Sequence, residues 1–193
     1  MFLSGLADAG KGETAAGGFF FGNYNPDYRT WTQREYGNRT GIFRVLDVLD
    51  RYQIKAGVAV NAMAAERYPF LIEQFRKRNY EFIAHGTSAN RMISSKMSEA
   101  EEKQEIATAI AALEKASGTK PSGWLGQEYG ESQRTPKLLA DAGLNYVLDW
   151  PNDDQPYAMK VGRKFVSMPN QRSEEHTSEL QSLTNLVCRL LLE

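Results

Sequence analysis

Apolar and polar residues follow two different periods along this chain. Short apolar runs, typical of buried strands, alternate with segments in which apolar residues recur every three or four positions, as on one helix face. The expected strands cover residues 54–60, 80–84, 123–126, 144–149 and 164–168. The expected helices begin near Thr40, Pro69, Ser98 and Thr135. Strands separated by single helices predict an α/β fold with a parallel sheet.

The ends of the helices carry sequence signals of their own. Ser98 and Glu101 have the spacing of a capping box, and Gly118 is expected to end the helix that they begin. Thr40 and Thr135 are expected to be N-caps, and a proline directly after Thr135 strengthens the second assignment.

The chain divides into three segments by composition. Residues 1–27 are rich in glycine and alanine and are expected to be irregular, whereas residues 28–171 are long enough for one domain. Residues 172–182 resemble one reading frame of a common sequencing adapter. We therefore predict that the tail 172–193, which holds the only cysteine, is not native. A native C-terminal helix with a stripe of leucines is the alternative.

Charge and hydropathy narrow the range of partners. The formal net charge is −1, which gives no electrostatic reason to expect a nucleic acid or an anionic membrane as partner. No apolar run approaches the ~20 residues of a transmembrane helix. The first residues lack the basic and apolar regions of a signal peptide, so we expect a cytoplasmic protein.

Three polar loops follow consecutive expected strands, at residues 85–90, 127–132 and 149–154. In a parallel sheet these loops share the edge where chemistry usually collects. His85, Glu131 and Asp149 are the candidate catalytic residues, with His85 as general acid or base and one of the two carboxylates orienting it. Such a set suits hydrolysis of a small polar or sugar-like substrate. The alternative is a structural histidine among solvated loop residues.

Further polar and aromatic side chains, some in or near these loops and one earlier in the chain, are candidates for binding the substrate. These candidates are Arg39, Trp124, Trp150, Asn152 and Asp153. Asp153 has an alternative interpretation as an ordinary turn residue, because aspartate side chains often bond to nearby backbone N–H groups.

Four segments give the chain a family resemblance. They are Glu-Tyr-Gly-Asn-Arg at 35–39, Ala-His-Gly at 84–86, Lys-Pro-Ser-Gly-Trp-Leu-Gly at 120–126 and Asp-Trp-Pro-Asn-Asp-Asp-Gln-Pro-Tyr at 149–157. In this order they resemble the polysaccharide deacetylase (NodB-homology) superfamily, in particular its allantoinase-like branch. The resemblance implies a parallel (β/α) barrel of the distorted seven-stranded type. It also implies hydrolysis of a non-peptide carbon–nitrogen bond, such as an N-acetyl group or a cyclic amide.

The chain departs from this family where metal binding is concerned. Metal-dependent members hold a divalent ion, usually zinc, through a first-strand aspartate and two histidines four residues apart. His85 matches the first histidine, but Ala89 stands at the second position, and residues 1–22 offer no clear counterpart of the aspartate. A zinc site needs three or four good ligands. We therefore expect no metal or other cofactor. The alternative is a divalent metal such as zinc, for which one histidine and distant carboxylates form an incomplete ligand set.

The family's closing strand is also missing, so we expect an inactive fragment of a barrel. Two alternatives to a metal-independent hydrolase stay open. One is a catalytically inactive barrel that binds a carbohydrate or a ureide. The other is a generic open α/β domain, which predicts that the three loops do not cluster.

Overall fold

The computed structural model describes residues 28–151 and 153–170. The chain forms two compact units, Met1–Gln53 and Ile54–Glu193, and each is described by itself. The predictions for residues 1–27, Asn152 and the tail from residue 172 lie outside the described residues.

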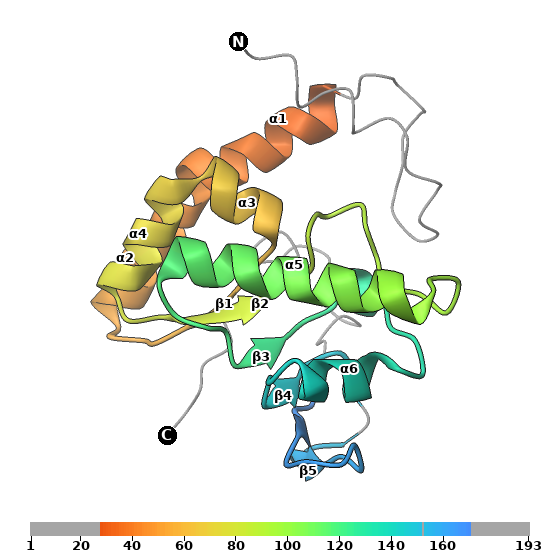
Figure 1. Cartoon of the computed structure of the whole chain (residues 1–193). Helices are drawn as coiled ribbons and strands as arrows, with labels where there is room; N and C mark the ends of the chain where they lie inside the picture. The colour runs from red at the N-terminus through yellow and green to blue at the C-terminus, as the bar shows by residue number, and fades with distance from the viewer. Residues whose placement is uncertain (1–27, 152, 171–193) are drawn as a thin grey trace. The chain divides into compact units, whose positions relative to one another are not determined.

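The first unit contributes consecutive helical segments (Figure 1). These are α1 (Tyr28–Tyr36), the π-helical turn η1 (Gly37–Gly41) and α2 (Ile42–Arg51). The prediction that Thr40 caps a helix is wrong. Thr40 lies inside η1, where the backbone is already helical and the N–H of Ile42 bonds to the carbonyl of Gly37. The apolar face expected for this segment is present, because Ile42, Leu46 and Leu49 are buried.

The second unit is built on a six-stranded sheet. Its strands are β1 (Gly57–Val60), β2 (Glu81–Ala84), β3 (Gly123–Trp124), β4 (Tyr146–Val147), β5 (Tyr157–Ala158) and β6 (Val166–Ser167). The order is β1-β2-β3-β4-β6-β5, and every neighbouring pair is parallel except β5 with β6. A strand forms in each of the five expected places. The short antiparallel strand β5 was not expected, because its neighbours in the sequence are turn-forming residues.

Four helices join the parallel strands: α3 (Ala62–Arg67), α4 (Pro69–Lys77), α5 (Glu99–Ser117) and α6 (Thr135–Asp141). The capping box of Ser98 and Glu101 is confirmed, and Gly118 ends α5 in the left-handed conformation. Thr135 is the first helical residue rather than the cap. Its hydroxyl accepts a hydrogen bond from the N–H of Ser132 instead.

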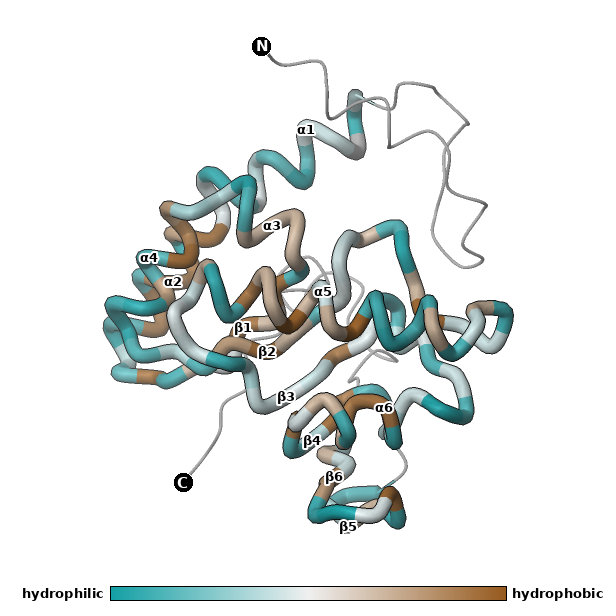
Figure 2. The backbone as a smooth tube through the Cα atoms, in the orientation of Figure 1, coloured by the Kyte–Doolittle hydropathy of each residue, from teal (hydrophilic) through white to brown (hydrophobic). Residues whose placement is uncertain are grey.

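The core lies between the sheet and these helices. Phe75 of α4 packs edge-on against Phe82 of β2, and α5 lies along β2 between α4 and α6 (Figure 1). The face of α5 predicted to be apolar is buried, including Ile106, Ala109 and Leu113. Figure 2 shows hydrophobic stretches in β1 and β2 and in the helices α4, α5 and α6.

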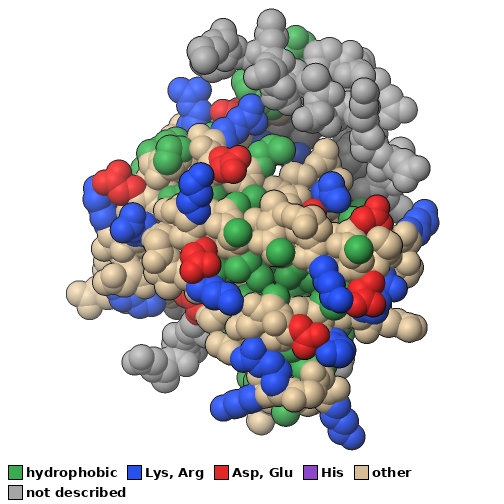
Figure 3. Space-filling model, viewed as in Figure 1, with side chains coloured by type: hydrophobic (Ala, Val, Ile, Leu, Met, Phe, Trp, Pro, Cys, Tyr) green, Lys and Arg blue, Asp and Glu red, His purple; other side chains and the backbone are tan. Residues whose placement is uncertain are grey.

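The surface carries charges of both signs. On the face in Figure 3, Lys and Arg side chains are interspersed with Asp and Glu side chains. Within residues 28–151 and 153–170, none of the helices is both long and apolar enough to cross a bilayer.

Candidate active site

The three polar loops lie at one edge of the sheet. They follow β2, β3 and β4, which are parallel neighbours, so their carboxyl ends meet at the same edge. Two hydrogen bonds join the loops: the Gln127 side-chain amide donates to the His85 carbonyl at 2.6 Å, and the Gly126 N–H donates to Asp149 Oδ1 at 2.6 Å. The predicted clustering is confirmed, which separates this chain from a generic open α/β domain.

His85 is half-buried, and its ring is fixed by a backbone carbonyl. Its Nδ1 lies 2.6 Å from the carbonyl oxygen of Leu125. A carbonyl only accepts, so Nδ1 carries the proton and the lone pair of the neutral ring is on Nε2. Burial lowers the pKa of His85, while the bond to Leu125 and the charge of Glu128 act in the opposite direction. Nδ1 therefore contacts a backbone carbonyl, and the orientation of the ring by Glu131 or Asp149 stays a prediction.

Glu131 and Asp149 form a buried pair of carboxyl groups that bond to each other. Burial raises the pKa of Glu131 to about 9, and the hydrogen bond and charge of Asp149 act in the same direction. Burial also raises the pKa of Asp149 to about 6, against the opposing effects of Glu131 and the Gly126 N–H. The pair therefore holds one proton at neutral pH.

The hydrogen bonding of the pair supports a shared proton. Glu131 Oε1 and Asp149 Oδ2 are both buried, and neither accepts a bond from a donor group in the described part of the chain. The indole N–H of Trp150 donates to Glu131, and the Gly126 N–H occupies Asp149 Oδ1. Two ionised carboxylates would repel each other here, so a proton between them is the arrangement that satisfies both.

Helix α5 fixes the loop that carries Glu131. Glu102 of α5 is fully buried and accepts hydrogen bonds from the hydroxyls of Ser132 and Thr135. Arg134 pairs with the same carboxylate at 3.2 Å. The residues that directly follow the candidate acid are thus tied to α5.

A second carboxylate of α5 fixes the loop that carries His85. Glu105 accepts from the N–H and the hydroxyl of Thr87, at 2.8 and 2.6 Å, and pairs with Arg91 at 2.8 Å. The sequence analysis missed Glu102 and Glu105. Their signal was available, because both lie on the face of α5 that also holds Ile106.

The loop after β3 has an unusual backbone. Glu128 and Tyr129, in the short 3-10 turn η2 (Gln127–Tyr129), have φ of 49° and 56°, in the left-handed region that non-glycine residues seldom adopt. Tyr129 packs against the apolar cluster of Ile83, Leu125 and Leu148, which holds the loop in this shape. Backbone strain of this kind is common at functional sites.

The residues predicted to bind substrate differ in burial and in their position relative to the candidate site. Trp150 is half-buried beside Glu131, but Trp124 is only 1% exposed and belongs to the core, so it cannot be an open pocket wall. Asp153 is exposed, and its side chain accepts from the N–H groups of the next two residues, as a turn residue does. Arg39 lies exposed in η1, in the first unit, and the site described here consists of residues of the second unit.

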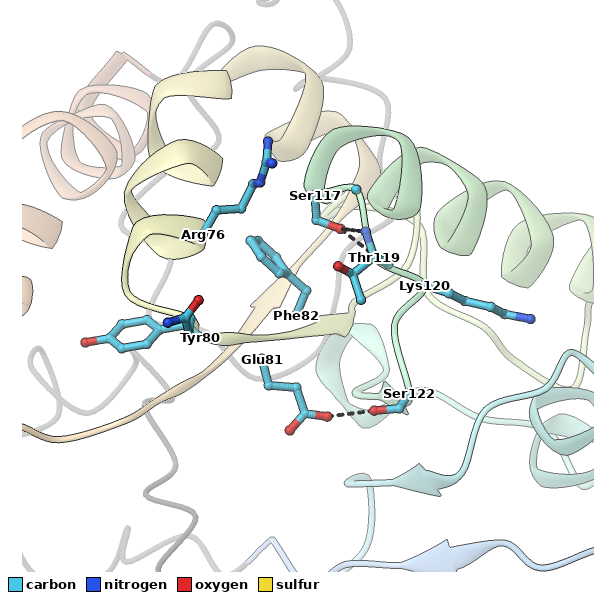
Figure 4. A pocket seen from close by; sticks show the side chains of 10 residues that line it. Arg76, Tyr80, Glu81, Phe82, Ser117, Thr119, Lys120 and Ser122 are labelled. Atoms are coloured by element: carbon cyan, nitrogen blue, oxygen red, sulfur yellow. Dashed lines mark hydrogen bonds between the residues drawn. The ribbon is translucent and has the colours of Figure 1, made fainter.

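A separate pocket of about 390 Å³ lies at the opposite, amino end of β2, between the last turns of α4 and α5 (Figure 4). Its polar groups bond to one another. Ser117 bonds to the backbone of Thr119, and Glu81 accepts from the hydroxyls of Ser122 and Tyr146. This pocket lies away from the three loops and is not part of the candidate site.

Comparison with known proteins decides the family. A family model described as polysaccharide deacetylase matches residues 31–147. The chain belongs to the polysaccharide deacetylase family. The family resemblance seen in the sequence is confirmed. A comparison with curated proteins finds no match.

Solved structures agree with this assignment. The chain is 28% identical to a protein assigned as a polysaccharide deacetylase from Mycobacterium smegmatis, with a TM-score of 0.68 over 74% of this chain and 49% of that one. It is also 28% identical to the Puue allantoinase and to a protein assigned as a polysaccharide deacetylase from Pseudomonas aeruginosa PAO1. Their TM-scores are 0.66 and 0.65, each over 72% of this chain and 46% of that one.

The chain thus spans about half the length of these structures. Its open parallel sheet corresponds to part of the distorted (β/α) barrel of this deacetylase family, as predicted.

Metal-dependent members of this deacetylase family hold a divalent ion through several side chains. Across the described ranges, no group of three His, Cys, Asp or Glu side chains is placed to hold a metal ion. Ala89, four residues after His85, is exposed and has no donor atom in its side chain. The described residues therefore do not fit such a metal.

Proposed function

We propose that this chain carries the catalytic edge of a metal-independent hydrolase that cleaves a non-peptide carbon–nitrogen bond. Membership of the polysaccharide deacetylase family supports a hydrolase. The observation that carries the finer proposal is the pairing of a base and an acid at one sheet edge. His85 has a free Nε2, and the Glu131–Asp149 pair retains a proton at neutral pH.

The two groups suit the two proton transfers of such a hydrolysis. Nε2 of His85 takes a proton from water as the water oxygen attacks the carbonyl carbon of the substrate. The carbon–nitrogen bond then breaks, and the leaving nitrogen takes the proton of the Glu131–Asp149 pair. The proton on His85 returns to the pair through solvent, which restores the starting state.

The proposed substrate is small and polar, either an N-acetylated sugar or a cyclic ureide. The chain resembles the Puue allantoinase and two assigned polysaccharide deacetylases to the same degree, so both substrate classes are to be assayed. Trp150 is proposed as one wall of the pocket. Because the chain spans about half of these relatives, we propose that turnover belongs to a polypeptide that completes the barrel.

The test measures hydrolysis of allantoin and of N-acetylglucosamine oligomers by the uninterrupted reading frame of the source gene, with and without a chelator. We expect turnover that the chelator leaves unchanged. His85→Ala and Glu131→Gln should each lower kcat on the order of 10²-fold or more. Glu114→Gln, an exposed carboxylate of α5, is the matched control and should leave kcat unchanged.

Three results would contradict the proposal. Loss of turnover in chelator with recovery in zinc would show a metal-dependent enzyme. Unchanged kcat in both site variants would remove the proposed acid and base. Binding of either ligand by the folded protein without turnover would favour the inactive barrel.

A further inference from the structure

The peptide group between Leu125 and Gly126 is bonded to a side chain at each end. Its carbonyl oxygen contacts His85 Nδ1 and its N–H donates to Asp149 Oδ1, both at 2.6 Å. The carbonyl and N–H of a trans peptide point in opposite directions. His85 and Asp149 therefore lie on opposite sides of one rigid, planar group, which connects them.

These two side chains bond to the peptide group that follows the last backbone hydrogen bonds between β3 and its neighbouring strands. The N–H of Leu125 still bonds to the carbonyl of Ala84, and the N–H of Leu148 bonds to that of Trp124. The next peptide group, between Leu125 and Gly126, instead bonds to the two side chains. Its orientation is therefore set by Asp149 and His85 and not by a neighbouring strand.

A glycine is needed at this point because of space. A Cβ at position 126 would lie 2.9 Å from the carbonyl oxygen of Gly130 and 3.0 Å from Asp149 Oδ2. The φ of Gly126 is −65°, which any residue can adopt, so the restriction comes from the close approach of the Gly130 carbonyl and of the Asp149 carboxyl. Glycine at position 126 thus leaves room for the Asp149 carboxyl to approach the peptide group.

Asp149 is well suited to anchor the peptide. It is only 4% exposed, and its other neighbours are fixed, since Glu131 bonds to it and Trp150 bonds to Glu131. A charged acceptor strengthens the bond from the N–H, and hydrogen bonds in a chain polarise one another. The charged groups nearby are Glu128 beside His85 and Glu102 beyond Glu131.

We propose that Asp149 is a positioning residue that acts through the Leu125–Gly126 peptide group to hold His85 in the tautomer with Nδ1 protonated and Nε2 free. This inference rests on the proposed role of His85 in hydrolysis, and it assigns Asp149 a second task beside sharing a proton with Glu131. A neutral imidazole in water exchanges between both tautomers, so holding one of them needs a fixed acceptor at Nδ1.

The test is nuclear magnetic resonance of the 193-residue chain labelled with ¹⁵N-histidine, at a pH where the ring is neutral. It needs no turnover, so its failure is distinct from failure of the proposed hydrolysis. The chain holds two histidines, and His176, assigned by His176→Gln, is the internal control. We expect the His85 Nδ1 resonance at the position of a protonated nitrogen and Nε2 at that of an unprotonated one.

Two substitutions separate anchoring from general packing. Asp149→Ala removes the acceptor, so both His85 nitrogens should move to averaged shifts, while the His176 resonances stay in place. Asp149→Asn keeps an oxygen that accepts from Gly126, so it should retain the separated shifts of His85.

The proposal is overturned if His85 in the unaltered chain has Nε2 protonated, a result that requires no variant to fold. It is also overturned if Asp149→Ala folds and keeps the separated shifts. Equal loss of the separation in Asp149→Asn and Asp149→Ala would likewise contradict anchoring by the hydrogen bond.

Discussion

At the scale of single residues, Glu131 and Asp149 lie in an unfavourable environment for two acids. The two acids are buried side by side and accept hydrogen bonds from Trp150 and from the Gly126 N–H. Among the described residues, neither acid forms a salt bridge with a lysine or arginine. An isolated buried carboxylate is unfavourable, and a second one beside it adds repulsion. Retaining a proton reduces both penalties, because the two carboxyl groups then carry a single negative charge.

The raised pKa of Glu131 predicts how stability depends on pH. In the unfolded chain Glu131 loses its proton near its ordinary value of 4.5, whereas the folded chain holds it up to about 9. The folded state therefore binds the extra proton, so the stabilisation is full below 4.5 and is lost as the pH rises toward 9. We expect the free energy of unfolding to fall from pH 7 to pH 9, above the pKa of about 6 of Asp149.

Urea unfolding followed by tryptophan fluorescence checks this. Glu131→Gln should flatten the decline between pH 7 and pH 9, because the side chain no longer ionises. Glu114→Gln, exposed on α5, should retain the decline of the unaltered chain. The same slope in Glu131→Gln and the unaltered chain would contradict the raised pKa.

Among the elements, α5 supports the candidate site. One face of this helix carries Glu102 and Glu105 one turn before Ile106 and Ala109, so the helix packs through its apolar part and holds two loops through its carboxylates. The capping box at Ser98 fixes the start of the same helix, only a turn away from Glu102. The site is thus carried by loops whose positions depend on one rigid helix.

Removing Glu105 should release the loop that carries His85. Glu105→Ala deletes the acceptor for the N–H and hydroxyl of Thr87 and the partner of Arg91, and bonds to a buried charge are worth about 2–3 kcal/mol. We expect that loss in the free energy of unfolding, with faster hydrogen exchange at the Thr87 amide.

Glu114→Ala on the exposed side of α5 is the matched control and should change stability by about 0.5 kcal/mol or less. Unchanged exchange at Thr87 in Glu105→Ala would show that the loop does not depend on this carboxylate.

At the scale of the molecule, the sheet of the second unit is open. Within the described part of the chain β1 and β5 stand at the two ends of the strand order, and they are not paired with each other. The edge strand of an open sheet can pair with a strand of another copy of the chain. An incomplete barrel can therefore associate through its edge strands, whereas a closed barrel has no edge strand.

We expect the 193-residue chain to self-associate as its concentration rises. Ala158 of β5 is exposed. Ala158→Lys should raise the highest concentration at which the chain is still a monomer, because edge lysines oppose strand pairing. Light scattering over a concentration series measures this. Ala111→Lys, on the exposed side of α5, adds the same charge away from the edge and should have little effect. Equal effects of the two lysines would point to net charge instead.

The sequence by itself determined the order of elements and the edge at which the polar loops meet. The apolar runs at 54–60 and 80–84, the capping box at Ser98 and the left-handed Gly118 are local signals, and local sequence is enough to set them. Placing His85, Glu131 and Asp149 at one edge followed from the parallel strands alone. The continuous helix through Thr40 and the antiparallel β5 were not predicted, because they depend on a π-helical turn and a distant partner strand.

Only the tertiary structure decided what each polar group touches. It gave His85 a backbone carbonyl as partner where a carboxylate was expected, and it joined Glu131 to Asp149 across two loops. It also buried Trp124 in the core. Sequence spacing fixes which edge a side chain reaches, but partners and pKa depend on burial and on contacts between segments far apart in the chain. Those contacts exist only once the strands are side by side.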